Sequence, residues 1–376
     1  MLANFSPLSS GPRGGPKKHH GDTPATARLS PRLELPPERA RGTNKFCLTP
    51  LLEVSTIRAA TARPRPLKTP KCPMLTNKRP WWVGTLIASL LLGAPSSGLG
   101  KDIFVNNQSG DDRRDGLGAE INGTVGGPKR TISRALRSAA KGDRIVLAAT
   151  GIPYREMLTL QAGINSGTPD RPFEIQGNGA VLDGTIEIPI DAWRPVRGDI
   201  YRFRPSSSRF QMLFRDSQPL ERLPATSDSG LPELKPWQWC VFERDVYLCL
   251  EPGKRISEYA LAQSGFQVGI TLYEVRHVVI EGLIVQGFRL DGIQCHDSVF
   301  DTALVNVTCR GNGRSGISVG GSCRVTVAGC LVGNNGEGQV RSEGNCHLEI
   351  VNSTLLENPA PALVREGGRV EVTNSN

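Results

Sequence analysis

The chain has 376 residues and a formal net charge of +9. Residues 1–73 alone carry that charge, with 13 Lys and Arg against 4 Asp and Glu, and they hold 12 of the 28 prolines. The rest of the chain is therefore balanced in charge, so the basic composition does not argue for a nucleic-acid partner, and we expect none. A basic, Pro-rich segment without apolar periodicity cannot bury a core, which predicts a disordered leader over residues 1–73.

Residues 74–100 have the pattern of a secretory signal peptide. A basic stretch precedes an apolar run from Trp81 to Ala94, and small residues suitable for cleavage stand before Lys101. The run is shorter than the roughly 20 residues of a spanning helix, which disfavours a membrane anchor. Because a signal peptide normally begins at the initiator Met, we expect translation to start at Met74 and residues 1–73 to be a mis-assigned start. The alternative is a genuine disordered tail on a protein that is not exported.

Residues 101–189 are predicted to form an N-terminal cap and the first strands. In residues 131–143 the apolar side chains recur at helical spacing, with Thr131 as a suitable N-cap and Gly142 as a stop. This helix is expected to cover the open edge of the first strands. Strands are predicted in three following segments: 144–149, 157–162 and 172–184.

Residues 190–273 are rich in aromatic side chains and break the rhythm of the surrounding segments. We interpret them as an inserted β-rich subdomain. Within it, the stretch WCVFERDVYLC predicts a hairpin that turns near Glu243 to Asp245.

Residues 274–376 contain a repeat of about 23 residues. The equivalent positions are spaced by 24, 23 and 23 residues, and an apolar residue follows each of them by 13 positions. Each unit holds three short β-type runs between Gly, Asn and Ser turns, which predicts one coil of a parallel β-helix. Successive coils would stack about 4.8 Å apart, so that equivalent residues form ladders. The equivalent positions are Ile280, Leu304, Val327 and Ile350, and the apolar residues that follow them are Ile293, Ile317, Val340 and Leu363.

A column of asparagines accompanies the repeat. Asn312, Asn335 and Asn358 each lie eight positions after their anchor, and Phe288 takes that place in the first unit. We expect the amides to form hydrogen bonds from coil to coil.

Three N-terminal stretches, IFVNNQSGDDRRDGLG, GPKRTISRALRSAAKGDRIVLAATGIPYRE and GTPDRPFEIQGNGAVLDG, resemble the entry segment of secreted right-handed parallel β-helix proteins of the pectin-lyase-like superfamily. The insertion, with GDIYRF, QMLFRDSQPLER and VYLCLEPG, is similar to that of bacterial members among carbohydrate-active enzymes. The resemblance covers most of residues 101–376. It implies an all-β fold: a right-handed parallel β-helix solenoid with an N-terminal capping helix and an inserted β-rich subdomain.

The resemblance also implies a polysaccharide partner, and we expect a monomer at the cell surface or outside the cell. It does not define the activity, because the superfamily includes lyases, hydrolases, esterases, epimerases and members without known chemistry. No catalytic motif of the superfamily can be matched residue by residue. Polygalacturonase-type members carry a run of acidic residues before a GI strand, whereas this chain has LDGIQCH, with the single Asp291.

The strand after each Gly/Asn turn is expected to present a polar outward face. Residues one and three places after the inward apolar positions form two columns: Gln294, Ser318, Arg341 and Val364, then His296, Gly320, Glu343 and Glu366. In β-helix enzymes of this kind a sugar chain lies along such a face. The candidate catalytic residues are Asp291, His296, Arg341, Glu343 and Glu366, and the candidate substrate-binding residues are Gln294, Trp237 and Trp239. The alternatives are an ordinary water-facing sheet and, for the tryptophans, core packing.

Either reaction class could use this face. A lyase acting on a uronic acid needs a cation to offset the carboxylate and a base such as Arg or His, whereas a hydrolase needs two carboxylates beside the bond. Glu343 and Glu366 are expected in adjacent coils, about 4.8 Å apart along the backbone. When two carboxylates lie this near to each other, the pKa of one of them should be raised, unless a cation or Arg341 lies between them. The pair could serve a retaining hydrolase or hold calcium for a lyase.

The acidic loop GDDRRDG could also gather calcium through Asp111, Asp112 and Asp115, although Asx-stabilised turns explain it better. The seven cysteines after residue 100 lack zinc spacing. Two pairs are disulfide candidates: Cys323 with Cys346, which occupy one column in adjacent coils, and Cys240 with Cys249, across the hairpin. Free interior thiols are the alternative.

The chain ends in RVEVTNSN, in the middle of an expected coil. We therefore expect either a cap of another kind or a truncated reading frame that lacks catalytic coils. Two functions remain open. One is an exported polysaccharide lyase or glycoside hydrolase, and the other is a non-catalytic β-helix that binds glycans at the cell surface.

Overall fold

The computed structural model describes residues 100–226, 230–356 and 358–376. The predicted leader, residues 1–73, lies outside them, and so does the predicted signal peptide, residues 74–100, apart from Gly100. Within the described part of the chain, no helix is long and apolar enough to cross a membrane.

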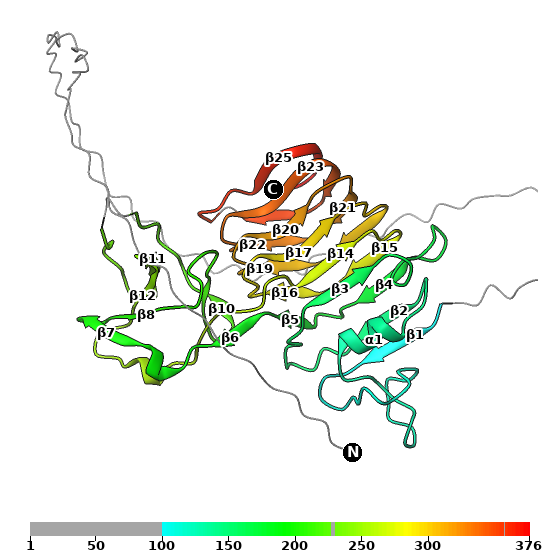
Figure 1. Ribbon diagram of the computed structural model, residues 1–376, viewed down its shortest axis with the longest axis horizontal. Helices are drawn as coiled ribbons and strands as arrows, with labels where there is room; N and C mark the ends of the chain where they lie inside the picture. The colour runs from blue at the N-terminus through cyan, green and yellow to red at the C-terminus, as the bar shows by residue number, and fades with distance from the viewer. Residues whose placement is uncertain (1–99, 227–229, 357) are drawn as a thin grey trace, which may run out of the picture. The chain divides into compact units, whose positions relative to one another are not determined.

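Three parallel faces, which we call sheets 1, 2 and 3, run along the stack of coils (Figure 1). The long strands β23 and β25 belong to both sheet 1 and sheet 2 and join them into one 12-stranded sheet. Sheet 1 contains β3 (Leu158–Gln161), β14 (Ile270–Tyr273), β17 (Asp291–His296), β20 (Ser315–Val319) and the first parts of β23 (Gly338–Val351) and β25 (Leu363–Thr373). Sheet 2 contains β1 (Asp102–Val105), β2 (Arg144–Leu147), β4 (Phe173–Gln176), β15 (Val278–Glu281), β18 (Thr302–Val305), β21 (Arg324–Ala328) and the second parts of β23 and β25. Sheet 3 contains β5 (Val181–Asp183), β16 (Ile284–Gln286), β19 (Thr308–Arg310), β22 (Leu331–Gly333) and β24 (Thr354–Leu356).

Each coil follows the chain from sheet 2 to sheet 3 to sheet 1, as in β15, β16 and β17. The predicted register is confirmed. Ile280 pairs with Leu304, Leu304 with Val327, and Val327 with Ile350 in sheet 2. The inward positions of sheet 1 pair in the same way, from Ile293 through to Leu363. The repeat therefore defines the coil, and its apolar ladders form one continuous core.

The asparagine column is hydrogen-bonded from coil to coil, as predicted, with Asn312 and Asn335 buried and Asn358 half-buried. Asn335 Oδ1 accepts from the backbone N and Nδ2 of Asn312, at 2.9 and 3.0 Å. Gln339 continues the ladder, because its Oε1 accepts from Asn335 Nδ2 at 3.0 Å and its Nε2 donates to Asn358 Oδ1 at 3.3 Å. Phe288, in the first unit, donates its backbone N–H to Asn312 Oδ1 at 3.1 Å.

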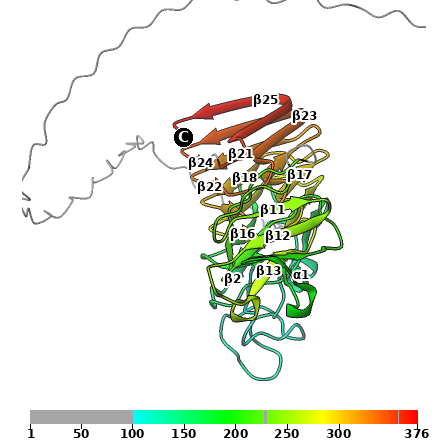
Figure 2. The same cartoon turned by 90° about the vertical axis from the view of Figure 1, so that its left-hand side faces the viewer.

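Helix α1 (Ile132–Ser138) covers the first coil, at the opposite end of the stack from β25 (Figures 1 and 2). The Thr131 side chain caps it by accepting from Arg134 N at 3.2 Å. Its buried face, Ile132, Ala135 and Leu136, joins the core of the coils. The helix ends before the predicted stop at Gly142, which lies in the following turn with a φ of +70°.

The insertion forms two four-stranded antiparallel sheets. One contains β6 (Thr185–Glu187), β9 (Leu213–Arg215), β10 (Gln218–Pro219) and β13 (Leu261–Ser264), and the other contains β7 (Arg194–Arg197), β8 (Ile200–Phe203), β11 (Trp239–Phe242) and β12 (Asp245–Cys249). Two short 3-10 helices, η1 (Ile190–Ala192) and η2 (Ile256–Glu258), connect them. The predicted bounds of 190–273 are displaced at both ends, because β6 already belongs to the insertion, whereas β14 pairs in parallel with β3 and β17.

The insertion replaces the connection between β5, a strand of sheet 3, and β14, a strand of sheet 1. In later coils this same connection carries the Asn turn. The backbone of the insertion packs directly on one such turn: a Cβ at Gly313 would lie 1.8 Å from the carbonyl oxygen of Phe210. Only glycine, which has no Cβ, permits that approach. The glycine at position 313 therefore allows the insertion to pack against the turn that precedes β20 of sheet 1.

The hairpin between β11 and β12 turns at Glu243 and Arg244, both with positive φ, and Phe242 pairs with Asp245. Its register puts Tyr247, not Cys249, opposite Cys240, so the expected pairing across the hairpin is wrong. Cys323 and Cys346 stack in adjacent coils, but all seven cysteines of the described residues are free, buried thiols. The interior thiols therefore fill the core as small apolar groups.

Candidate functional site

The outward side chains of sheet 1 form the predicted columns. The register places Gln161, Tyr273, His296, Gly320, Glu343 and Glu366 in one column. Because neighbouring coils lie about 4.8 Å apart, these residues line a continuous strip that runs across the coils. Gln294 stands in the second column beside Ser318, where it is half-buried.

Arg341 is the centre of a charged cluster on this strip. Its side chain is only 9% exposed, and its Nη1 lies 2.6 Å from Glu366 Oε2. Glu343 Oε1 is 3.9 Å from Arg341 Nε, and Glu337 Oε2 is 3.8 Å from Arg341 Nη2. Arg341 Nε also donates to Ser315 Oγ at 3.3 Å. One nearly buried cation thus holds carboxylates from two consecutive coils and from the turn before β23.

Asp291 lies in the same cluster but not on the open face. Its carboxylate is fully buried and accepts from Arg314, through Nε at 3.0 Å and through Nη2. Arg314 Nη1 in turn lies 3.6 Å from Glu343 Oε1. The expectation that Asp291 lines the groove is therefore wrong, because its strand position turns the side chain away from the open face, and its buried carboxylate pairs with Arg314.

The charges decide the protonation of Glu366. The hydrogen bond and the charge of Arg341 lower the pKa of Glu366 below its usual value. The two stacked carboxylates were expected to raise one pKa unless Arg341 intervened, and Arg341 does intervene. Glu366 is therefore ionised over the physiological range.

His296 stands two coils from Glu343, at the other side of Gly320. Its Nδ1 lies 2.9 Å from Asp297 Oδ2, and its ring centroid lies 5.3 Å from that of Tyr273. Tyr273 is 39% exposed, so the pair forms an aromatic platform on the column. The absent side chain of Gly320 leaves an open place between this platform and Glu343, whose Cβ is the nearest atom to a Cβ built at Gly320, at 3.6 Å.

Neither candidate tryptophan lies on sheet 1. Trp239 is fully buried in the core of the insertion, and its Nε1 donates to Leu220 O at 3.0 Å. Trp237 packs edge-to-face on Tyr259, and the guanidinium of Arg215 lies over its ring at 4.0 Å. These contacts occupy both rings, so the expectation that they stack on a sugar is wrong, and core packing explains them.

The acidic loop of the N-terminal segment uses its carboxylates within the fold. Asp111 and Asp115 accept from backbone N–H groups two residues ahead, and Asp112 accepts from Arg130 N, Thr131 N and Thr131 Oγ1. The pKa values of Asp111 and Asp115 are lowered mainly by these backbone hydrogen bonds. Among the residues that the structure describes, no group of three or more His, Cys, Asp or Glu side chains is arranged to hold a metal ion.

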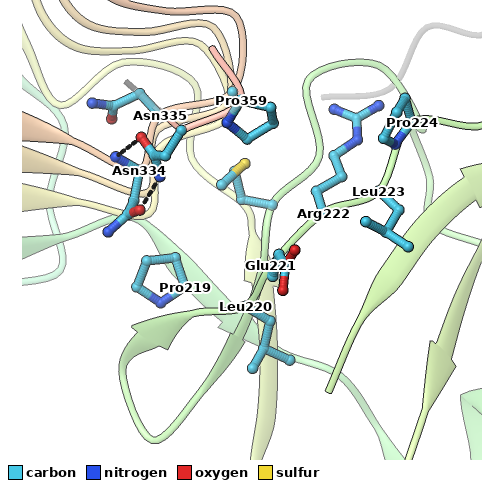
Figure 3. Close-up of a pocket in the computed structure, with 12 residues that line it drawn as sticks. Pro219, Leu220, Glu221, Arg222, Leu223, Pro224, Asn334, Asn335 and Pro359 are labelled. Carbon is cyan, nitrogen blue, oxygen red and sulfur yellow. Dashed lines mark hydrogen bonds between the residues drawn. The ribbon is translucent and has the colours of Figure 1, made fainter. Parts of the chain in front are cut away.

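A pocket of about 480 Å³ lies between the insertion and the Asn turns (Figure 3). From the insertion it is lined by Met212 and residues 219–224, and from the coils by Asn334, Asn335, Gly336, Asn358 and Pro359. Glu337, the next residue after Gly336, belongs to the Arg341 cluster, so the pocket and the face of sheet 1 adjoin at one turn.

The geometry defines a parallel β-helix with a charged strip on sheet 1. Residues 259–376 match the family model for a right handed beta helix region, which covers the coils from β14 onward. The coils of this chain therefore form a right-handed parallel β-helix. No curated protein has a matching sequence.

Solved structures with looser likeness include a complex of XylC with xylose, at 12% identity over 73% of this chain and 70% of that chain, with a TM-score of 0.36. A glycoside hydrolase matches at 12% identity over 68% of this chain and 76% of that one, with a TM-score of 0.43. The GH136 lacto-N-biosidase from Eubacterium ramulus matches at 12% identity over 68% of this chain but 41% of that one, with a TM-score of 0.36.

Sequence reasoning missed three members of the strip and its surroundings. Arg314 and Glu337 lie in turns, outside the alternation used to find outward residues, although each directly precedes a strand of sheet 1. Tyr273 was assigned to the insertion, and only its pairing with His296 reveals its place. The pocket has no sequence signal, because its two walls come from segments more than 100 residues apart.

Proposed function

We propose that this protein is an exported carbohydrate-active β-helix protein that binds a glycan along sheet 1 and hydrolyses it with Glu343 and Glu366. The observation that carries the proposal is the arrangement around Arg341, which holds two carboxylates of consecutive coils on an open polar strip. Retaining glycosidases use two carboxyl groups about 5 Å apart, close to the spacing of neighbouring coils.

The roles follow from the contacts. Glu366, whose pKa is lowered by Arg341, is the ionised carboxylate that attacks the anomeric carbon. Glu343 is held more loosely, at 3.6 Å from Arg314 and 3.9 Å from Arg341, and donates the proton to the leaving oxygen. Tyr273, on the same column, lies three coils from Glu343 and four from Glu366, and it stacks on a sugar ring at that distance from the reacting bond.

Charge favours hydrolysis over elimination. Four carboxylates, those of Asp291, Glu337, Glu343 and Glu366, face two guanidiniums in the cluster. An acidic strip repels a uronate and suits a neutral sugar at the reacting position. A lyase would need excess positive charge there to stabilise the carboxylate of its substrate.

The second candidate is a glycan-binding protein without catalysis. The observation that favours it is the 2.6 Å ion pair between Glu366 and the nearly buried Arg341. A pair of this kind can have a purely structural role, in which it holds the side chains of the face in place without taking part in a reaction. In that case Tyr273 and the polar columns bind a glycan that the protein does not cleave.

The deciding experiment screens the purified full chain against neutral and acidic polysaccharides for new reducing ends and for unsaturated products that absorb in the ultraviolet. Reducing ends without absorbance support hydrolysis, both together support a lyase, and binding with neither supports the second candidate. Absence of both binding and cleavage would refute a carbohydrate role for the face. Glu343→Gln and Glu366→Gln should each lower turnover about 100-fold or more. Glu349→Gln, on the outward face of sheet 2, is the matched control and should leave turnover unchanged.

A further inference from the structure

The pocket between the insertion and the Asn turns contains an arginine without an ionic partner. Arg222 occurs in none of the ion pairs or side-chain hydrogen bonds found within residues 100–226, 230–356 and 358–376. Its guanidinium carbon lies 5.5 Å from the ring centroid of Trp239, so the side chain packs near that ring at the wall of the pocket. Figure 3 shows the side chain at the wall formed by the insertion, across the pocket from Asn334 and Asn335.

The surroundings make this cation costly to leave unpaired. Burial lowers the pKa of Arg222 below its usual value, although a guanidinium still remains charged. The charge of Glu337 attracts Arg222 and partly offsets the effect of burial, but neither Glu337 nor the neighbouring Glu221 forms an ion pair with it among the described residues. Glu337 pairs with Arg341 at 3.8 Å, and Glu221 Oε2 accepts from Gln238 Nε2 at 3.1 Å. An anionic ligand would supply the missing partner, and a carboxylate matches the planar fork of a guanidinium with two parallel hydrogen bonds.

The rest of the lining suits a sugar. Pro219, Leu223 and Pro359 give apolar walls against which the C–H face of a pyranose can pack. Asn334 and Asn358 line the same space, and Asn358 Nδ2 donates to Asn334 Oδ1. Each amide nitrogen has two N–H groups, so both can still donate to hydroxyl groups of a ligand. The volume of about 480 Å³ falls within the range of roughly 300–1,000 Å³ that is typical of small-molecule sites.

We propose that this pocket binds a hexuronate residue, with its carboxylate on Arg222, its hydroxyls on Asn334 and Asn358, and its apolar face on the prolines. The site is distinct from the Glu343 and Glu366 strip and holds whether or not that strip is catalytic. With this pocket the protein can recognise an acidic sugar residue of a glycan. The adjoining strip of sheet 1 suits a neutral sugar residue of the same glycan.

The test is calorimetric titration of the full chain with glucuronate and with galacturonate, each compared with the neutral hexose and with inorganic phosphate. Saturable binding of at least one uronate, without binding of its neutral hexose or of phosphate, is expected. Arg222→Gln should weaken that binding about tenfold to a hundredfold, as expected for loss of a charge-assisted pair. Arg197→Gln, at an exposed position of the same insertion, is the matched control and should bind like the parent.

A second variant tests whether weaker binding by Arg222→Gln could result from misfolding. Arg222→Lys keeps the charge and should fold with the parent melting temperature, yet it should bind more weakly because it loses the fork. Glu343→Gln separates this site from the strip and should bind the uronate normally. Unchanged binding in Arg222→Gln, equal binding of the neutral hexose or of phosphate, or loss of binding in Glu343→Gln would each overturn the assignment. No binding of either uronate by the parent would overturn it as well.

Discussion

Replacing Asn335 by Ala tests the internal asparagine ladder. Asn335 is 2% exposed, and its side chain makes five hydrogen bonds. Its loss leaves the backbone N–H of the fully buried Asn312 and the carbonyl of Cys309 without these partners. Each buried polar group left unsatisfied costs roughly 1–3 kcal/mol, so the free energy of unfolding should fall by about 2–5 kcal/mol.

Asn358→Ala is the matched control in the same column. Asn358 is half-buried, and its Oδ1 accepts from Asn334 N at 2.8 Å and from Gln339 Nε2 at 3.3 Å. Water can replace it for both donors, so the loss should stay below about 1 kcal/mol. Urea unfolding followed by circular dichroism measures both variants. Equal losses in the two variants, or a loss below about 0.5 kcal/mol for Asn335→Ala, would refute the reasoning that desolvation makes the ladder stabilising.

Because the pKa of Glu366 is lowered in the folded state, its contribution to stability should be complete above the unfolded pKa of about 4.3 and should vanish as pH falls through the folded value. The difference in melting temperature between the parent and Glu366→Gln should therefore shrink below about pH 4, and a difference that grew on acidification would contradict the ion pair with Arg341. Tyr273→Ala should weaken binding of any glycan that the face accepts by up to about tenfold, measured by affinity electrophoresis, with unchanged affinity as the contrary result. Peptide mass mapping without reduction should find Cys323 and Cys346 unlinked, and a bridge between them would show that the interior thiols oxidise. N-terminal sequencing of exported protein should begin near Lys101, and recovery of the peptide LELPPER from native protein would contradict a start at Met74.

The sequence by itself determined the coil. The repeat of 23 residues has apolar residues at two equivalent positions in every unit. Only one register of the strands lets both sets face inward, because a shift of the register by one residue would turn every side chain to the other face. Ile280 with Leu304 and Ile293 with Ile317 were paired correctly for that reason. The capping helix and the hairpin also followed from local signals, the Thr131 cap and the turn at Glu243 and Arg244.

The candidate site was predictable only where it follows the repeat. Arg341, Glu343 and Glu366 were found because alternation on a strand fixes which side chains face outward. Asp291 was misplaced although it lies two residues before the inward Ile293, so alternation puts it on the inner side, and its partner Arg314 is a turn residue whose side-chain direction has no period. The tryptophans were misjudged because alternation alone does not say which face of an insertion is its core.

Only the tertiary structure decided the electrostatics and the pocket. The lowered pKa of Glu366 depends on the 2.6 Å approach of a guanidinium from the neighbouring coil, a distance that spacing along the chain does not define. The place of Arg222 in the pocket wall depends on how the insertion packs on the Asn turns, and that contact joins segments more than 100 residues apart. Periodicity specifies neighbours within the solenoid, whereas contacts between the solenoid and its insertion depend on packing that no local pattern encodes.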